Sequence, residues 1–403
     1  MKIFLLTPIY ATTTSMQGAT PVVHYFAREW VKMGHEVTVF HFDAKFPRIM
    51  YWVGRHFQHQ LNTRLGMMVP THCPQEKDYI TDGVAVHRRC LKKMLPHSRY
   101  SNSQLKRALK IIEKECDRLG VPDWFIGHWD NPQLELLGVL KKYYGKSTCL
   151  VLHENVFDFE KKYGEEGVKM LFDLDVVGFR SLIGKRNFEK KYGRPKSSFI
   201  ASSGVSEFFL KSGEENVRLV QQPVRNYVFV GSLIARKYPL AVLRALSQAY
   251  PEGDFSLTFI GDGAEKINIE EEHRKLGEKG ELYFTGRIPR ERIVQYLKQA
   301  DVFVMISRAE IFGLVYLEAM ALGVIPVGSR NEGVDGVIVD GINGFLCKAG
   351  DVNELTGILR NIKQMPSEQL IEISRRAKET AFEYSDSEVA KRYLEALISK
   401  QIM

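Results

Sequence analysis

Two glutamates eight residues apart, Glu310 and Glu318, flank Gly313 in the segment SRAEIFGLVYLEAMALGVIP, residues 307–326. A strand is predicted to end just before this segment, and a helix to begin at Gly313 and run through Glu318. A carboxylate inside an otherwise apolar helix is costly unless a partner satisfies it. Two interpretations stay open. In the first, Glu318 pairs with an Arg or Lys in the core. In the second, both carboxylates bind opposite ends of one extended ligand, and the helix N-terminus, Phe312–Leu314, binds its anionic middle.

Two other turns between a strand and a helix could bind phosphate groups, since ligands of open α/β sheets bind at the carboxyl ends of strands. In VGSLIARKYP, Arg236 and Lys237 follow a strand ending at Gly231. They could neutralise a diphosphate with charge-assisted hydrogen bonds, or form an ordinary solvated helix start. In TPIYATTTSMQGAT, Gly18 lets the backbone approach a phosphate closely. GxGxxG is absent, so a dehydrogenase loses its main support.

Short β-branched or aromatic runs alternate with longer stretches of helical period, which is typical of parallel sheets with crossover helices. The pattern predicts an α/β fold with two doubly wound domains, joined near residues 221–226, and an amphipathic helix over 385–399. The predicted strands are Ile3–Thr7, Glu36–Phe42, Val84–His87, Trp124–Gly127, Thr148–His153, Ser198–Ala201, Tyr227–Val230, Ser256–Ile260, Leu282–Thr285, Val302–Ile306 and Val324–Val327.

The segment 44–75 fits neither pattern, because it is basic, aromatic and punctuated by prolines. We predict an insertion or a long loop there. It is either solvated or rests on an anionic membrane surface, together with the predicted helix 104–119 and the cations Arg88, Arg89, Lys92 and Lys93. Residues 1–100 hold 13 Lys and Arg against 6 Asp and Glu, nearly the whole net charge of +8. This asymmetry favours an anionic partner for the front half.

Length and composition bound the class of protein. The 403 residues, 44% of them hydrophobic, suffice for two domains and disfavour low-complexity disorder. The five cysteines lack any CxxC or Cys/His metal spacing, which favours a reduced, cytoplasmic protein. The opening MKIFLLTPIY is expected to be a buried strand and not a signal peptide, and no apolar stretch is suited to span a membrane.

The segment 307–326, preceded by ADVFV and followed by DGINGF, resembles the C-terminal domain of the family 4 retaining glycosyltransferases, which have the GT-B fold. The similarity runs over nearly the whole chain: Gly18 matches the family's N-terminal glycine loop, and Gly286 the turn that faces the base. The resemblance implies two Rossmann-like domains facing a central cleft. Residues 1–222 would bind the acceptor and 223–384 the donor, with the last helix, 385–403, packing back on the first domain.

The resemblance also implies metal-independent, retaining transfer of a hexosyl group from a UDP- or GDP-sugar, with no further cofactor. Lys237 would bind the diphosphate, Glu310 the sugar hydroxyls and Glu318 the ribose. His128, in FIGHWDN, would line the acceptor side near the anomeric carbon, with His153, in LVLHENV, as a second candidate. The catalytic candidates are therefore His128, Lys237 and Glu310, and the implied donor-binding residues are Gly18, Gly231, Arg236, Lys237, Arg287, Glu310, Phe312, Gly313, Leu314 and Glu318.

Some features depart from the family pattern or leave other functions open. Ser232 stands where the family usually has arginine, and Gly336 where a glutamate is common. The string Asp173-Leu-Asp175 is the one candidate for Mg²⁺ or Mn²⁺. A nucleotide-sugar 2-epimerase and a non-catalytic nucleotide-sugar-binding protein are the alternatives. The expected acceptor is a saccharide, lipid-linked at the inner face of the cytoplasmic membrane, as in capsule, O-antigen or exopolysaccharide synthesis; no nucleic-acid partner is expected.

Overall fold

The computed structural model describes residues 1–10, 21–65, 70–96, 98–153, 156–215 and 219–399. The chain divides into two compact units. The first unit comprises residues 1–58, 68–204 and 386–403, and the second comprises 205–385 together with 59–67. Gly18 therefore lies outside the described residues.

The boundary between the units lies at residue 204, whereas the sequence pattern predicts it after residue 222. The reason is helix α7, Glu207–Glu215, which packs against two helices of the second unit. Val205, Phe209 and Val220 are all buried in the core of that unit. The apolar residues before the predicted linker thus belong to the second core.

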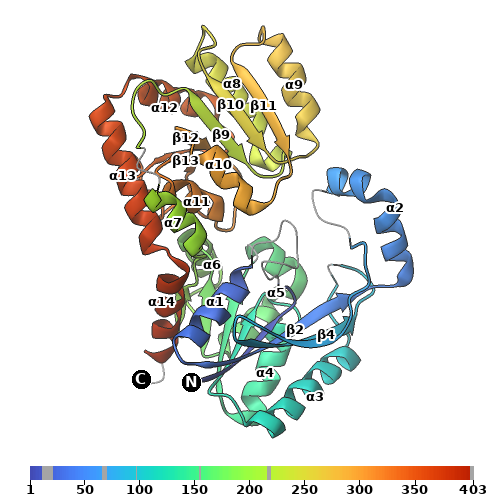
Figure 1. Ribbon diagram of the computed structural model, residues 1–403. Helices are drawn as coiled ribbons and strands as arrows, with labels where there is room; N and C mark the ends of the chain where they lie inside the picture. Colours follow the sequence, from blue (N-terminus) through green and yellow to red (C-terminus); the bar gives the residue numbers. More distant parts are fainter. Residues whose placement is uncertain (11–20, 66–69, 97, 154–155, 216–218, 400–403) are drawn as a thin grey trace. The chain divides into compact units, whose positions relative to one another are not determined.

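The first unit is built on an eight-stranded sheet that is parallel except for one edge strand (Figure 1). Its central strands are buried on both faces, which explains their continuous apolar runs. In spatial order the strands are β3 (Lys77–Thr81), β4 (Val84–Lys92), β2 (Glu36–Lys45), β1 (Lys2–Thr7), β5 (Trp124–His128), β6 (Ser147–Leu152), β7 (Val176–Phe179) and β8 (Ser198–Ile200). The antiparallel edge strand β3 and the strand β7 were not predicted from the sequence.

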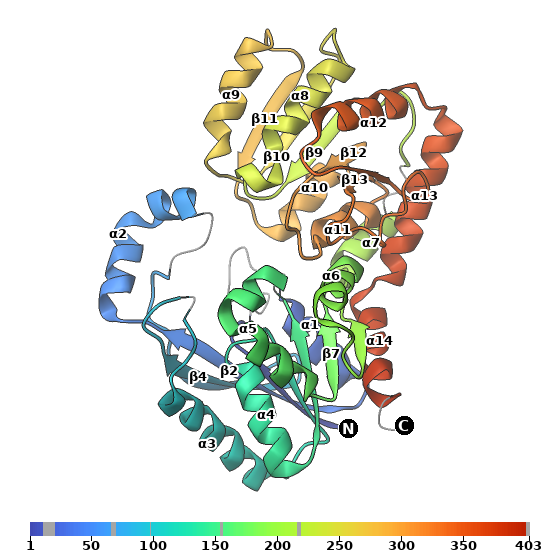
Figure 2. The ribbon, with the colours of Figure 1, turned by 180° about the vertical axis from the view of Figure 1, so that it is seen from behind.

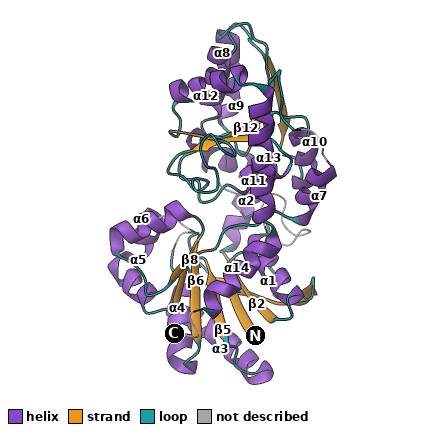
Figure 3. Ribbon diagram, turned by 90° about the vertical axis from the view of Figure 1, so that its left-hand side faces the viewer, coloured by secondary structure: helices purple, strands orange, loops and turns teal. Residues whose placement is uncertain are grey.

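Helices cover both faces of this sheet (Figures 1 and 3). One face carries α3 (Asn102–Leu119), α4 (Gln133–Tyr144), α5 (Val156–Phe172) and α6 (Leu182–Tyr192), and the other carries α1 (Val22–Lys32) and α14 (Asp386–Ile398). The chain's last helix is held on α1 because Trp30 Nε1 donates a hydrogen bond to the Ala390 carbonyl, 3.0 Å away. The Tyr393 ring also packs edge-on against Trp30, with 5.0 Å between ring centroids.

Helix α2, Arg48–Leu65, occupies most of the segment for which the sequence predicts a loop. The alternative of a long loop is wrong for 48–65, and the alternative of an insertion stays a prediction. The helix is interrupted at Phe57, whose φ is −122°. Among the side chains described in this helix, those of residues 48–57, Ile49 and Trp52 are exposed while Tyr51 is buried, so these residues do not form one buried apolar face.

The second unit is built on a six-stranded, fully parallel sheet (Figure 2). In spatial order its strands are β11 (Glu281–Gly286), β10 (Ser256–Ile260), β9 (Asn226–Val230), β12 (Val302–Val304), β13 (Ile325–Ser329) and β14 (Phe345–Cys347). Helix α8 (Pro239–Ala249) packs with α9 (Glu265–Lys275) and α12 (Val352–Gln364), while α11 (Leu314–Ala321) packs with α7 and α13 (Ser367–Glu383). Two Rossmann-like sheets with flanking helices confirm the predicted fold class.

Short helical segments η1 (Ala235–Lys237), η2 (Arg290–Arg292) and α10 (Ile293–Leu297) lie in the loops of the second unit. All five cysteines are free thiols, and only Cys73 is exposed. Within the described ranges, no helix combines the length and the apolar character needed to cross a membrane.

Candidate functional site

Two turns meet at the carboxyl edge of the second sheet, one after β9 and one after β12. These strands are neighbours and run in parallel, so their carboxyl ends share one edge. The Arg308 N–H donates to the Arg236 carbonyl at 2.8 Å, and Arg236 Nη1 donates back to the Arg308 carbonyl at 3.3 Å. The two sequence-predicted turns are thus joined by hydrogen bonds.

This junction brings Lys237 against Glu310. The distance from Lys237 Nζ to Glu310 Oε2 is 3.5 Å, and Arg236 Nη1 lies 4.0 Å from the same oxygen. The buried Ser307 hydroxyl donates to that oxygen at 3.4 Å. The side chains of Lys237 and Glu310 are 15% and 17% exposed, so both are partly desolvated yet open to a ligand. Three of the implied donor-binding residues therefore form one cluster.

Two glycines give this cluster its space. A Cβ added to Gly231 would lie 3.0 Å from Lys237 Nζ, and a Cβ added to Gly313 would lie 2.7 Å from the Tyr316 ring. Gly313 also has a φ of +78°, a left-handed conformation that favours glycine, and it caps the N-terminus of α11. The backbone at both predicted glycine positions is therefore kept free of side-chain bulk beside the lysine and the carboxylate.

Glu332 is a site residue whose role was not predicted from the sequence. Its Oε2 accepts a hydrogen bond from the Glu310 N–H at 3.0 Å, and the N–H of Gly333 donates to the Glu310 carbonyl at 2.9 Å. Burial raises the pKa of Glu332. These bonds fix the backbone of Glu310 from the turn after β13. The sequence could have indicated this role, because β13 is the next parallel strand beside β12 and the turns after both strands lie at the same edge of the sheet.

Glu318 forms an ion pair with Arg290, which lies in η2. Arg290 Nε donates to Glu318 Oε1, and the carboxylate is 4% exposed. The guanidinium also lies over the Phe209 ring, 5.5 Å from its centroid. The first of the two interpretations, in which an arginine satisfies the carboxylate, thus describes the contact that the chain makes by itself, although Arg290 lies at the edge of the core and not inside it. Binding of a ribose by Glu318 stays a prediction.

The other implied donor-binding residues contribute less to this cluster. Arg287 is exposed in the loop after β11. The Phe312 side chain is buried in the core of the second unit, and Leu314, the first residue of α11, packs partly against that core. Ser232, which replaces the family's arginine, is half-buried beside Gly231.

His128 and His153 lie at the carboxyl ends of two adjacent strands of the first unit, β5 and β6. His128 Nδ1 is 2.9 Å from His153 Nε2, and His128 Nε2 is 3.4 Å from the Tyr393 hydroxyl. His153 stacks on Trp129 at 3.9 Å between centroids. His128 is completely buried and His153 is only partly buried, so His153 is the more accessible histidine of the pair.

We predict that the protein is less stable in acid because of the buried pair His128 and His153. Burial holds the pKa of both rings well below 6.5, and the positive charge of Arg180 adds to this. Below about pH 6.5 the unfolded chain binds protons that the folded chain does not, so the free energy of unfolding falls by about 1.4 kcal/mol per pH unit for each such histidine. His128→Gln is expected to reduce this slope between pH 6 and pH 5 in urea unfolding, whereas the exposed His72→Gln leaves it unchanged. Equal slopes in all three proteins would contradict the burial argument.

Asp175, in the candidate metal-binding segment Asp173-Leu-Asp175, makes its contacts with other residues of the first unit. Asp175 Oδ2 accepts hydrogen bonds from the N–H and the hydroxyl of Thr148, both at 2.9 Å, and its Oδ1 pairs with Lys141 at 2.7 Å. In the parts of the chain that are described, no three His, Cys, Asp or Glu side chains are grouped to hold a metal ion. The donor set at Asp173 and Asp175 therefore does not fit a metal site.

Comparison with known families places the cluster in a recognised domain. Residues 216–382 match the family model described as Glycosyl transferases group 1. This range contains Lys237, Glu310 and Glu318, and it confirms the sequence resemblance at the level of that domain.

Curated relatives match a part of their own length. N-acetyl-alpha-D-glucosaminyl L-malate synthase of Bacillus anthracis is 32% identical over 149 residues, 36% of this chain and 38% of the relative. GDP-mannose-dependent alpha-(1-6)-phosphatidylinositol monomannoside mannosyltransferase of Mycolicibacterium smegmatis is 29% identical over 199 residues, 46% of this chain and 52% of the relative. The chain thus spans about half or less of the length of these two proteins.

Among solved structures, Anabaena HepE in complex with UDP and glucose superposes with a TM-score of 0.65 and 16% identity, covering 99% of this chain and 100% of that one. At this identity the likeness speaks for the fold alone. It confirms the predicted GT-B architecture of two Rossmann-like sheets with helices.

Proposed function

We propose that this chain is a retaining glycosyltransferase that moves a hexosyl group from a UDP- or GDP-sugar to a saccharide acceptor. One observation carries the proposal: Lys237 and Glu310, from separate turns at the carboxyl edge of the second sheet, lie 3.5 Å apart beside Gly231. A cation and a carboxylate so placed suit the two halves of a nucleotide sugar, the diphosphate and the sugar hydroxyls. The match to the Glycosyl transferases group 1 model over these residues supports the same assignment.

The reaction breaks the bond between the anomeric carbon and the diphosphate oxygen, so negative charge grows on the leaving group. Lys237 and Arg236 are positioned to stabilise that charge, and the N-terminus of α11 adds a partial positive charge. The acceptor hydroxyl attacks on the face from which the diphosphate departs, and the departing oxygen takes its proton. No metal is needed in this scheme, since the chain supplies the cations.

The acceptor is proposed to be a lipid-linked saccharide in cell-surface polysaccharide synthesis. The support is the basic front of the chain, with a charge excess of +7 in residues 1–100, which suits a diphosphate-bearing lipid at an anionic membrane. A relative named for transfer to a phosphatidylinositol monomannoside points to the same acceptor class.

A direct test combines binding and turnover. Calorimetry with UDP, GDP and their sugars is expected to give micromolar binding of one nucleotide class, and incubation of that donor with lipid-linked and free saccharides to give a product of retained anomeric configuration by NMR. Ser232 in place of the family's arginine favours a non-catalytic nucleotide-sugar-binding protein as the second candidate. Tight donor binding with no consumption across the acceptor panel would support that candidate, and conversion of the free donor without acceptor would indicate an epimerase.

A further inference from the structure

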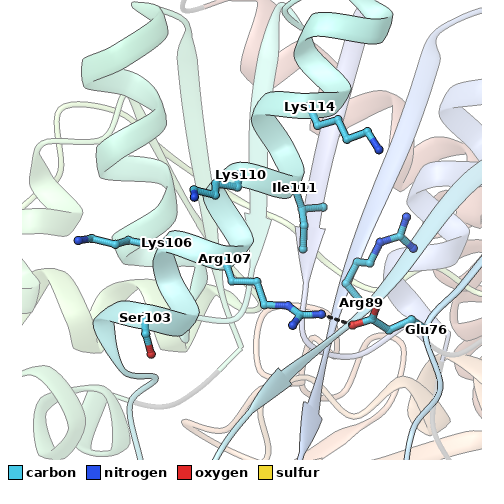
Figure 4. A pocket seen from close by; sticks show the side chains of 8 residues that line it. All are labelled: Glu76, Arg89, Ser103, Lys106, Arg107, Lys110, Ile111 and Lys114. Atoms are coloured by element: carbon cyan, nitrogen blue, oxygen red, sulfur yellow. Dashed lines mark hydrogen bonds and ion pairs between the residues drawn. The ribbon is translucent and has the colours of Figure 1, made fainter.

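A strongly basic surface lies on α3 of the first unit, outside the proposed donor site. It lines a hollow of about 470 Å³ (Figure 4). We call it the α3 basic surface and define it by the residues that line the hollow: Glu76, Arg89, Ser103, Lys106, Arg107, Lys110, Ile111 and Lys114. Five of these eight side chains are cationic and one is acidic.

The helix period explains how these cations gather. At about 100° per residue, positions 103, 106, 107, 110, 111 and 114 fall within an arc of about 140°. Lys106, Lys110 and Lys114 follow one another at intervals of four and extend about 12 Å along the axis. The buried side of α3, with Ala108 and Ile112, packs on the sheet. Repulsion between like charges four residues apart disfavours a helix, so folding does not account for this row.

The lysines of the row are available for a partner, while the arginines are engaged. Arg107 pairs with Glu76 at 2.6 Å, and Arg89 makes two hydrogen bonds to Asp78, which hold the pKa of that carboxyl at about 2. Lys106, Lys110 and Lys114 are exposed, and no described acidic group lies within ion-pair distance of them. Three uncompensated positive charges therefore face solvent from one stretch of helix.

Exposed apolar side chains stand in the loop that leads into α3. Met94 is 74% exposed and Leu95 is 65% exposed, and both directly follow Lys92 and Lys93. The Lys92 N–H donates to Gln104 Oε1 at 2.8 Å, which fixes the start of this loop to the first turn of α3. Apolar side chains beside lysines are typical of surfaces that enter the boundary between headgroups and acyl chains.

We propose that the α3 basic surface, with Met94 and Leu95, binds the anionic headgroups of a lipid membrane. The row of lysines complements the charge of such a membrane, and the two exposed apolar side chains distinguish a lipid surface from a soluble polyanion. This contact would bring the chain to lipid-linked acceptors, but it does not rest on the proposed donor chemistry. It needs no group of the second unit.

The test is flotation of the full chain with vesicles of phosphatidylglycerol and phosphatidylcholine. Each lysine near an anionic surface contributes about a fivefold factor in partitioning, so K106A/K110A/K114A is expected to bind about 100-fold more weakly. The matched control, K275A/K279A/K391A, removes the same charge from exposed lysines elsewhere and is expected to bind like the unaltered chain. M94S/L95S is expected to weaken binding while the release by salt persists.

Circular dichroism melts would establish that each variant is folded. The inference is overturned if K106A/K110A/K114A floats like the unaltered chain, if both triple variants lose binding equally, or if vesicles of phosphatidylcholine alone bind as well. It is also overturned if the chain binds heparin but no anionic vesicle, since the surface would then serve a soluble polyanion. Donor binding is measured separately, so failure of the unaltered chain to float, with its donor binding intact, rejects this inference and leaves the proposed function standing.

Discussion

Lys237→Ala is expected to lower kcat for sugar transfer by about 100- to 1000-fold, the usual effect of removing one preorganised group that stabilises charge in the transition state. Lys237 Nζ lies 3.5 Å from Glu310 and next to the bare backbone of Gly231, where a diphosphate can approach. Stability should change by less than about 1 kcal/mol, because the pair is partly exposed and Arg236 remains near the carboxylate. Steady-state kinetics with the best donor and a urea titration measure the two effects.

Two further variants test the same site. Glu310→Ala is expected to impair transfer to a similar degree, since it removes the group proposed to bind the sugar hydroxyls. Lys348→Ala, an exposed lysine of the same unit, serves as the matched control and should retain full activity. Full activity in both the Lys237 and the Glu310 variants would refute the proposed function, because the cluster that carries it would then be dispensable.

The sequence was informative wherever local pattern and sheet topology act together. Runs such as Ile3–Leu6 are buried on both faces of a parallel sheet, so composition alone marks them as strands. The turns that carry Lys237 and Glu310 could be singled out in advance, because ligands of parallel sheets bind at the carboxyl ends of strands, and the family resemblance assigned both residues to one donor. The helix over 104–119 was equally predictable, since its buried residues recur at helical spacing.

Contacts that depend on tertiary packing could not be predicted from the sequence. Arg290, the partner of Glu318, lies 28 residues away in a short helical turn that no periodicity marks. Strand β14 has three residues, too few for an alternating pattern. Helix α2 was missed because its described apolar side chains, such as the exposed Trp52 and the buried Tyr51, do not mark one buried face. In each case the information resides in contacts between elements.

Arg290→Ala is expected to lower the free energy of unfolding of the second unit by about 3 kcal/mol, because it leaves the Glu318 carboxylate buried without its counterion. Glu318→Gln should cost less. The Glu318 side chain is 4% exposed but Arg290 is 22% exposed, so a released guanidinium can reach water whereas a released carboxylate cannot. Urea unfolding followed by far-ultraviolet circular dichroism measures both, with Arg292→Ala in the same turn as the control.

The same two variants separate the two interpretations of Glu318. If the carboxylate also binds ribose, Glu318→Gln should weaken nucleoside diphosphate binding at least as much as Arg290→Ala does, even though it destabilises the fold less. If the ion pair is only structural, affinity should follow stability, and Arg290→Ala should be the more harmful change in both measurements. A double variant R290M/E318M that regains stability while nucleotide binding stays lost would assign both roles to Glu318, since apolar side chains can replace a buried ion pair but cannot accept hydrogen bonds from a ribose.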